Sequence, residues 1–340
     1  MLRDTLRKAG IAAGMALGAA TLTVSTPALA EWKPTKPITI VVPWGAGGST
    51  DQIVRLLAVE LEKALGQTFV VVNQPGAQGA IGTKSVLDAP RDGYTWASGA
   101  AKDIGTYAVT GLVDTKLADW NLYLAVINTS VLSVNANSPY QTVEELVEAM
   151  RERPGAITVA TAGVNSSGGA AVAALSNALN VEVRQVTYDG GNPASIAAAG
   201  GETIATTQLA ADQAEMIRAK RLRPLAVLGS RSLTLEGFGE IPSITEAYPE
   251  YPVADDYFGI FIPKDVPPEV LAKVDEIWTE QIANSDAIRR YGTEKGAIMA
   301  VASGEEAQKA ALPSIQKMAW SLVESGQAKA DPASVGIPKP

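Results

Sequence analysis

Four times along this chain, a strand-like segment ends in a loop of small residues and a helix-like segment follows. In the first case, the apolar run ITIVVP at 38–43 leads into WGAGGSTD, and apolar residues then recur at three- and four-residue spacing until Gly66. Continuous β-branched runs are typical of strands that are buried on both faces of a sheet. Strands that alternate with helices need crossover connections. The pattern therefore predicts an open α/β sheet.

A second series of strands and helices begins near residue 130. A helix is expected at 142–155, with Thr142 as its N-cap and Glu145 three residues later, as in a capping box. AITVATAG and VEVRQVTY (181–188) are expected strands on either side of an Ala-rich helix. No stretch repeats with a period of 20–50 residues, which disfavours a solenoid. The length of the chain allows two domains.

The small-residue loops at 44–51, 73–82, 161–169 and 188–195 are candidate anion-binding sites. In an open α/β sheet, ligands bind beyond the carboxyl ends of the strands, where helix N-termini present unpaired N–H groups. The first loop lacks the third glycine of a dinucleotide-binding motif and the lysine of a Walker loop, so nucleotide binding has little support. The alternative for each loop is an ordinary turn with capping residues.

Histidine and cysteine are both absent from the sequence. This excludes Ser-His-Asp and Cys-His catalysis and the usual zinc sites, and it leaves no cysteine for a disulfide or a lipid anchor. No catalytic residue, metal ligand or cofactor is therefore predicted. A secreted enzyme that relies on carboxylates, serine or lysine alone remains the alternative to a binding protein.

Residues 1–30 have the pattern of a cleavable secretory signal peptide. Arg3, Arg7 and Lys8 precede an apolar stretch, and Ala28 and Ala30 fit the −3 and −1 positions of a cleavage site. The mature chain is expected to begin at about Glu31; a retained membrane anchor is the alternative. The first 30 residues hold three of the 28 basic and one of the 36 acidic residues. The remainder therefore has 25 against 35, a net charge of −10. Nucleic acid is not an expected partner of so acidic a chain.

Several sequence blocks, in order, resemble the Bug family, the extracytoplasmic receptors of tripartite tricarboxylate transporters. The opening blocks are KPITIVVP, GGSTD, VVNQPGAQGAIG and APRDGYT, and VTYDGGNPA and LRPLAVLGSRS follow later. The resemblance covers nearly all of the mature chain. It implies a two-domain, type II-like periplasmic-binding-protein fold, in which each domain is a mostly parallel sheet flanked by helices and the ligand cleft lies between them. The implied domains are residues 31–131 plus 254–340, and residues 132–253.

The resemblance also implies a function. A periplasmic receptor of this kind captures a small carboxylate, such as a di- or tricarboxylate or an aromatic acid, by closing like a hinged trap. It then delivers the ligand to the permease subunits in the membrane, and the receptor itself is expected to be a monomer. The alternative is a receptor that uses the same closure to signal to a membrane sensor.

The expected ligand-binding residues lie in the small-residue loops or near them. They are Trp44, Gly45, Ala46, Gly47, Gly48, Ser49, Thr50, Gln78, Lys102, Asn165, Ser166, Ser167, Tyr188, Gly190, Gly191, Asn192, Gln208 and Asp255. The sequence departs from the family pattern at Asp189, where lysine is frequent, and at Gln208, where an aspartate is usual. These departures are expected to change the ligand and leave the fold intact.

Some of these residues have two interpretations. Trp44 either walls the cleft or stacks on a flat ligand, and Lys102 either pairs with a distal carboxylate of the ligand or forms a salt bridge with Asp103. Asp51 lies in the first turn of a helix, where an acid is favourable whatever is bound, so its role is expected to be structural. Acidic residues such as Asp255 either suit an amino group on the ligand or are solvated surface charges.

Overall fold

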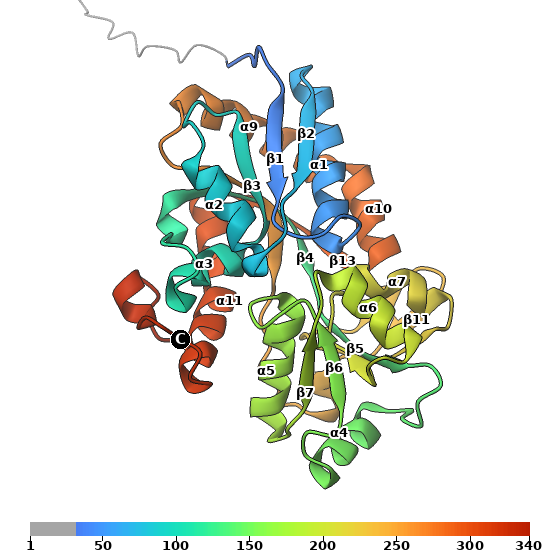
Figure 1. Cartoon of the computed structure of the whole chain (residues 1–340). Helices are drawn as coiled ribbons and strands as arrows, with labels where there is room; N and C mark the ends of the chain where they lie inside the picture. Colours follow the sequence, from blue (N-terminus) through green and yellow to red (C-terminus); the bar gives the residue numbers. More distant parts are fainter. Residues whose placement is uncertain (1–31) are drawn as a thin grey trace, which may run out of the picture. The chain divides into compact units, whose positions relative to one another are not determined.

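The computed structural model describes residues 32–340, which belong to one unit of the chain (Figure 1). The predicted signal peptide and its cleavage site lie outside the described residues. Two separate sheets, each with helices packed against it, form this unit, together with a small two-stranded sheet. The predicted α/β class is therefore confirmed. The prediction of mostly parallel sheets is wrong, because both sheets also contain antiparallel pairs of strands.

The first sheet has six strands in the order β13-β4-β12-β3-β1-β2. β1 pairs in parallel with β2 and β3, whereas β12 is antiparallel to β3 and β4, and β13 is antiparallel to β4. Strands β1 to β4 consequently run in one direction and the two strands from the C-terminal part of the chain run in the other. The bounds are β1 Ile38–Val42, β2 Phe69–Asn73, β3 Thr95–Ala100, β4 Trp120–Asn128, β12 Tyr257–Pro263 and β13 Ala297–Ser303.

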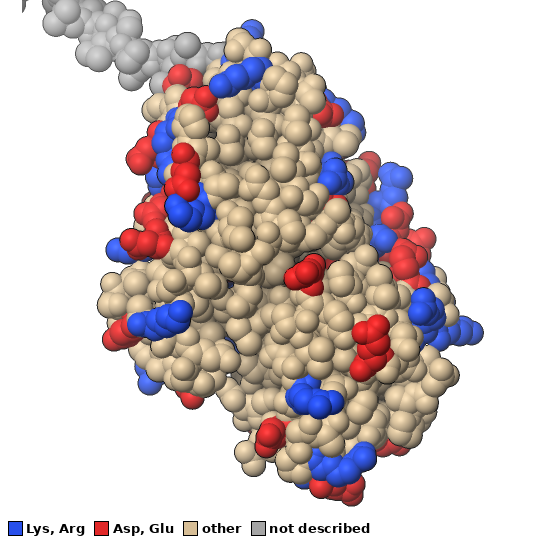
Figure 2. Space-filling view, in the orientation of Figure 1, with Lys and Arg blue, Asp and Glu red and all other residues tan. Residues whose placement is uncertain are grey.

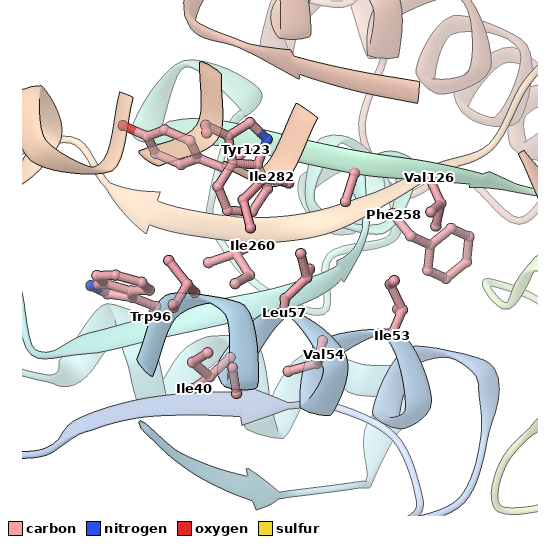
Figure 3. Packing of buried hydrophobic residues seen from close by; sticks show 14 of the residues in the cluster. Ile40, Ile53, Val54, Leu57, Trp96, Tyr123, Val126, Phe258, Ile260 and Ile282 are labelled. Atoms are coloured by element: carbon pink, nitrogen blue, oxygen red, sulfur yellow. The ribbon is translucent and has the colours of Figure 1, made fainter. Parts of the chain in front are cut away.

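Six helices accompany the strands of the first sheet. Their bounds are α1 Ser49–Leu65, α2 Ala80–Asp88, α3 Ala101–Thr110, α9 Pro268–Glu280, α10 Asp286–Lys295 and α11 Gly304–Glu324. As predicted, α1 ends at Gly66, which takes the left-handed conformation (φ 62°) that glycine adopts without steric cost. Its buried face points Ile53, Val54 and Leu57 at the sheet side chains (Figure 3).

The second sheet has five strands in the order β7-β6-β8-β5-β9. β6 pairs in parallel with β7 and β8, and β5 is antiparallel to β8 and β9. The bounds are β5 Val131–Asn135, β6 Thr158–Thr161, β7 Arg184–Thr187, β8 Ala205–Thr206 and β9 Leu222–Val227. The accompanying helices are α4 Val143–Glu152, α5 Ser167–Leu179, α6 Gly191–Gly200, α7 Ala210–Arg218 and α8 Ile244–Ala247.

The predicted N-cap of α4 is confirmed, because the Thr142 side chain accepts a hydrogen bond from the Glu145 N–H at 3.3 Å. The sequence patterns predict neither β4 nor β13, two strands that pair with each other along one edge of the first sheet. The C-terminal tail after α11 contains a short 3₁₀ helix. The remaining elements are β10 Leu233–Leu235, β11 Gly239–Ile241, and the 3₁₀ helices η1 Ala77–Gly79, η2 Leu117–Asp119, η3 Ile282–Asn284 and η4 Pro332–Val335.

The chain passes from the first sheet to the second at residues 129–130 and returns before β12. A backbone hydrogen bond holds the two crossing segments side by side, because the Asn128 N–H donates to the Asp256 carbonyl at 3.0 Å. Ser130 is also tied to the second sheet, since its carbonyl accepts from the Leu228 N–H after β9 at 2.8 Å. On the face shown in Figure 2, basic and acidic side chains are interspersed along the margins and the middle is largely uncharged. That face has no basic stripe of the kind that binds nucleic acid.

Candidate functional site

Three helices that follow strands of both sheets begin around one small cavity. They are α1 after β1, α5 after β6 and α6 after β7, and the cavity has a volume of about 40 Å³. Each helix N-terminus presents unpaired N–H groups and the positive end of a helix dipole. The lining residues are Trp44, Gly45, Gly48, Ser49, Thr50, Asp103, Ala162, Ser166, Ser167, Gly190, Gly191, Asn192, Pro193, Gln208, Leu209, Asp212 and Phe258.

Most of the predicted ligand-binding residues meet at this cavity, because the first loop and the loops of the second sheet approach each other closely. A Cβ atom at Gly45 would lie 3.1 Å from the Asp189 carbonyl oxygen. The predicted residues that line the cavity are Trp44, Gly45, Gly48, Ser49, Thr50, Ser166, Ser167, Gly190, Gly191, Asn192 and Gln208.

The other predicted residues lie nearby but outside the lining. Ala46 and Gly47 are exposed, and the Tyr188 hydroxyl donates to Glu202 at 3.3 Å. Gln78 joins two loops, since its Oε1 accepts from the Asn165 N–H at 2.8 Å. Lys102 and Asp255 instead line a second cavity, described below.

Asp51 has a structural position, as its place in the first turn of α1 suggests. Its carboxylate accepts from the Gly47 N–H at 2.9 Å, from Arg55 and from Asn73 at 2.9 Å. Burial by itself favours protonation of Asp51, but these hydrogen bonds and the Arg55 charge outweigh it and lower the pKa of the carboxyl below its ordinary value. Asp51 therefore holds the first loop in place, and the Gly47 N–H that it occupies is not available to a ligand.

Asp212, in the first turn of α7, is the main site residue that the sequence analysis missed. Its Oδ1 accepts from the Ser49 backbone N–H at 2.7 Å, and its Oδ2 lies 3.4 Å from the Ser49 hydroxyl. Burial raises the pKa of Asp212 to about 6, although the hydrogen bonds from Ser49 and the Leu209 backbone oppose the shift. An acid in a first turn, as at Asp51, was the available signal, but it does not reveal that α7 faces α1.

A buried ionic cluster lies beside the cavity and links the two sheets. The Lys102 Nζ atom on α3 is 2.8 Å from Asp103 Oδ1, 3.2 Å from Asp256 Oδ2 and 3.1 Å from the Ser167 Oγ on α5. Ser167 also donates to Asp256 at 2.6 Å. Of the two interpretations of Lys102, the salt bridge with Asp103 is the contact present in the structure.

The cluster places two carboxylates around one ammonium. Burial, with repulsion from Asp256, raises the pKa of Asp103 to about 6 despite the attraction of Lys102. Burial opposes the charge of Lys102, but the two carboxylates outweigh it and hold its pKa above the ordinary value. The Trp44 side chain also hydrogen-bonds to Asp103, so Trp44 both lines the cavity and anchors this carboxylate.

A second cavity, of about 300 Å³, lies on the other side of this cluster. It is lined by α5, α11 and the segments that cross between the sheets, and Ser167 borders both cavities. Arg231 Nη2 lies 3.8 Å from Asp255 Oδ2 at this second cavity. Asp255 therefore lines this second cavity together with Ser167, the first residue of α5, and is not part of the lining of the small cavity.

Among residues 32–340, there is no cluster of three or more acidic side chains positioned to hold a metal ion. Among the same residues, no helix is both long enough and apolar enough to cross a membrane.

Comparison with known proteins gives consistent matches. Residues 53–312 match the family model described as tripartite tricarboxylate transporter family receptor. The chain is 28% identical to Protein BugT of Bordetella pertussis over 90% of this chain and 94% of BugT. It is 33% identical to the UPF0065 protein in the tcbD-tcbE intergenic region of Pseudomonas sp. strain P51, over 82% of this chain and 83% of that protein.

Solved structures agree with the sequence matches. The structure of R. palustris Rpa4515 with adipate has a TM-score of 0.78 and 26% identity, covering 86% of this chain and 98% of that one. The periplasmic binding protein BugD has a TM-score of 0.79 and 23% identity, covering 87% of this chain and all of BugD, which shows a shared fold.

Proposed function

This chain belongs to the tripartite tricarboxylate transporter family of receptors, and on that basis we propose that it captures a small carboxylate and delivers it to a membrane transporter. The family consists of periplasmic solute-binding proteins and not of enzymes. The carboxylate class is supported by the adipate complex of the similar R. palustris protein. We propose the periplasm as the location, a monomer as the working form, and permease subunits as the partner.

The observation that carries this proposal is the convergence of α1, α5 and α6 on one cavity. Gly48 and Gly190, the N-caps of α1 and α6, have no side chain of their own to satisfy the first N–H groups of their helices, and at α1 Asp212 accepts from the first of these, the Ser49 N–H. Gln208 adds a side-chain amide whose Nε2 atom is buried and has no hydrogen-bond partner among the described residues. Backbone and side-chain N–H groups of this kind bind carboxylates without lysine or arginine.

We propose that the binding units are residues 31–131 plus 254–340, and residues 132–253. A ligand that contacts α1 from one unit and α5 or α6 from the other stabilises the closed form, in which the two units are close. The stabilisation equals the difference between the ligand's binding free energies for the closed and the separated form. The loops and Gln208 hold the ligand, and no covalent step is involved.

Titration calorimetry of the purified protein tests this function with a panel of di-, tri- and aromatic carboxylates and amino acids. At least one of them is expected to bind with a Kd in the micromolar range or below, about −8 kcal/mol. Absence of binding across the panel, with protein shown by circular dichroism to be folded, contradicts the proposal.

Gln208→Leu is the site variant, because it removes the unpartnered donor and keeps a side chain of similar size. It is expected to weaken binding by about ten- to hundredfold, as loss of one hydrogen bond to a charged group does. Gln327→Leu, at an exposed position after α11, is the matched control and is expected to bind as the unchanged protein does.

A further inference from the structure

We propose that the preferred ligand carries an ammonium group next to its carboxylate, as an amino acid does, and that Asp212 binds this ammonium while the Ser49 N–H binds the carboxylate. The inference rests on the proposed function, and it narrows the ligand class at the same cavity.

The first argument is the charge of the cavity wall. Of the described residues that line it, Asp103 and Asp212 are the charged ones, and neither lysine nor arginine is among them. A dicarboxylate placed there would have its second carboxylate near two acids and no cation. A ligand that has a positive charge is favoured by the same wall.

The second argument is that the two acids differ in their partners. Asp103 is 2.8 Å from the Lys102 ammonium. Each partner of Asp212 is neutral: the N–H and hydroxyl of Ser49 and the backbone of Leu209. Among residues 32–340 no ion pair reaches Asp212, although it is only 6% exposed. A buried carboxylate without a counter-charge is costly, and a ligand ammonium would supply the missing charge.

Asp212 lies between two helix N-termini, those of α1 and α6. Its Oδ1 accepts from the first N–H of α1, and a Cβ atom at Gly191 in α6 would lie 2.2 Å from its Oδ2. A zwitterion inserted between Ser49 and Asp212 would replace one hydrogen bond by two. Its carboxylate would accept from the Ser49 N–H, and its ammonium would donate to Asp212. Gln208, buried and with an unpartnered Nε2, offers the same carboxylate a further donor.

The two charges of such a ligand must lie close together, because Ser49 and Asp212 are in direct contact in the structure. Neighbouring carbons, as in an α-amino acid, give that spacing. A cavity of about 40 Å³ also favours a compact ligand over an extended one. The structure therefore points to small amino acids ahead of di- and tricarboxylates.

The test compares matched ligands by titration calorimetry at pH 7.5: L-aspartate with succinate, L-glutamate with glutarate, L-alanine with propionate, and L-phenylalanine with 3-phenylpropionate. In at least one pair the amino member is expected to bind tenfold or more tightly than its partner. If the members without an amino group bind equally well or better, the inference is overturned and the proposed function stands. If folded protein binds none of the eight compounds and none of the wider carboxylate panel, both fail.

Variants then identify the residue responsible. Asp212→Asn keeps the size of the side chain and is expected to reduce the preference for the amino member to threefold or less. Asp265→Asn removes an equal charge from an exposed position outside the cavity lining and is expected to leave the preference unchanged. If Asp212→Asn retains the full preference, the assignment to Asp212 is overturned. The ligand pairs test the idea on the unaltered protein even if Asp212→Asn does not fold.

Discussion

At Ser49, the backbone N–H that the sequence offers to a ligand anion already has a carboxylate partner. Asp212 comes from a helix 163 residues further along the chain and accepts from this N–H at 2.7 Å. The first loop therefore binds an anion that belongs to the protein itself. Asp51 does the same for the Gly47 N–H. Because Asp212 is buried without a counter-charge, its ionisation has a desolvation cost that the hydrogen bonds from Ser49 offset only in part.

Asp212→Asn is expected to stabilise the ligand-free protein more at pH 7.5 than at pH 4.5. The ordinary pKa of the aspartyl carboxyl is 3.8 and burial raises it to about 6, so between these values the folded protein binds more protons than the unfolded chain. The free energy of unfolding then falls as pH rises from about 4 through 6. The asparagine does not titrate, so at pH 7.5 the variant is expected to gain about 2 kcal/mol more than at pH 4.5.

Urea unfolding of both proteins at the two pH values measures this difference. Asp265→Asn, at an exposed position, is the matched control and is expected to give the same small change at both values. An equal effect of Asp212→Asn at pH 4.5 and pH 7.5 contradicts the explanation.

At the scale of elements, the start of α5 is positioned by contact between backbones. Ser166 caps the helix, its Oγ accepting from the Gly169 N–H at 3.0 Å and donating to the Gly163 carbonyl at 2.7 Å. This leaves so little room that a Cβ atom at Gly169 would lie 2.1 Å from the Gly163 carbonyl oxygen. The obstructing atom belongs to the backbone, so a side chain at position 169 would displace the turn that carries Ser166 and Ser167.

Gly169→Ala is expected to lower the free energy of unfolding by about 1–3 kcal/mol, the usual cost of overpacking. It is also expected to weaken ligand binding, because the start of α5 must shift away from the cavity. The measurements are urea unfolding and titration calorimetry with the tightest ligand of the panel.

Gly200→Ala is the matched control for this prediction. Gly200 lies at the end of α6, and a Cβ atom there would meet nothing within 4 Å. Alanine is expected to be neutral or to stabilise by up to about 1 kcal/mol, since it loses less backbone entropy on folding. Equal destabilisation by both alanines would show that the contact with Gly163 is not the cause.

At the scale of the whole molecule, the Lys102 cluster connects the two sheets. Lys102 and Asp103 belong to α3 of the first sheet, Ser167 begins α5 of the second, and Asp256 lies in the segment that returns to β12. Both cavities border this cluster. A change in the distance between the two sheets would therefore change the distances among these charges, whether it begins at the small cavity or at the second one.

Lys102→Met is expected to lower the free energy of unfolding by about 3–5 kcal/mol, because it leaves the buried carboxylates of Asp103 and Asp256 without a cation. Lys84→Met is the control: Lys84 pairs with Asp88 at 2.7 Å, but both side chains are about 60% exposed. Its loss is expected to cost about 1 kcal/mol or less. Urea unfolding at pH 7.5 checks both values, and a loss at Lys102 no larger than that at Lys84 contradicts the prediction.

The sequence by itself determined the α/β class, the helix starts around the cavity and the family. Strand and helix periodicity and helix capping are local patterns, so the sequence alone predicts them. The order of the small-residue loops along the chain identifies the family. It also placed Ser49, Ser166, Gly191 and Gln208 at one site, since βα loops gather at the carboxyl ends of strands. The edge strand β13 and its neighbour β4 were not predicted, because their pairing joins residues far apart in the chain.

Only the tertiary structure decided which charges meet. Asp51 and Asp212 have the same sequence context, the first turn of a helix. The structure separates them, since Asp51 forms a salt bridge with Arg55 and Asp212 lies buried against Ser49. Lys102 and Asp255, which the sequence groups with the other expected ligand-binding residues, line the second cavity and not the small one, and Lys102 is part of the ionic cluster. Interactions between charges depend on separation and burial, and neither follows from local sequence once the partners lie on different sheets.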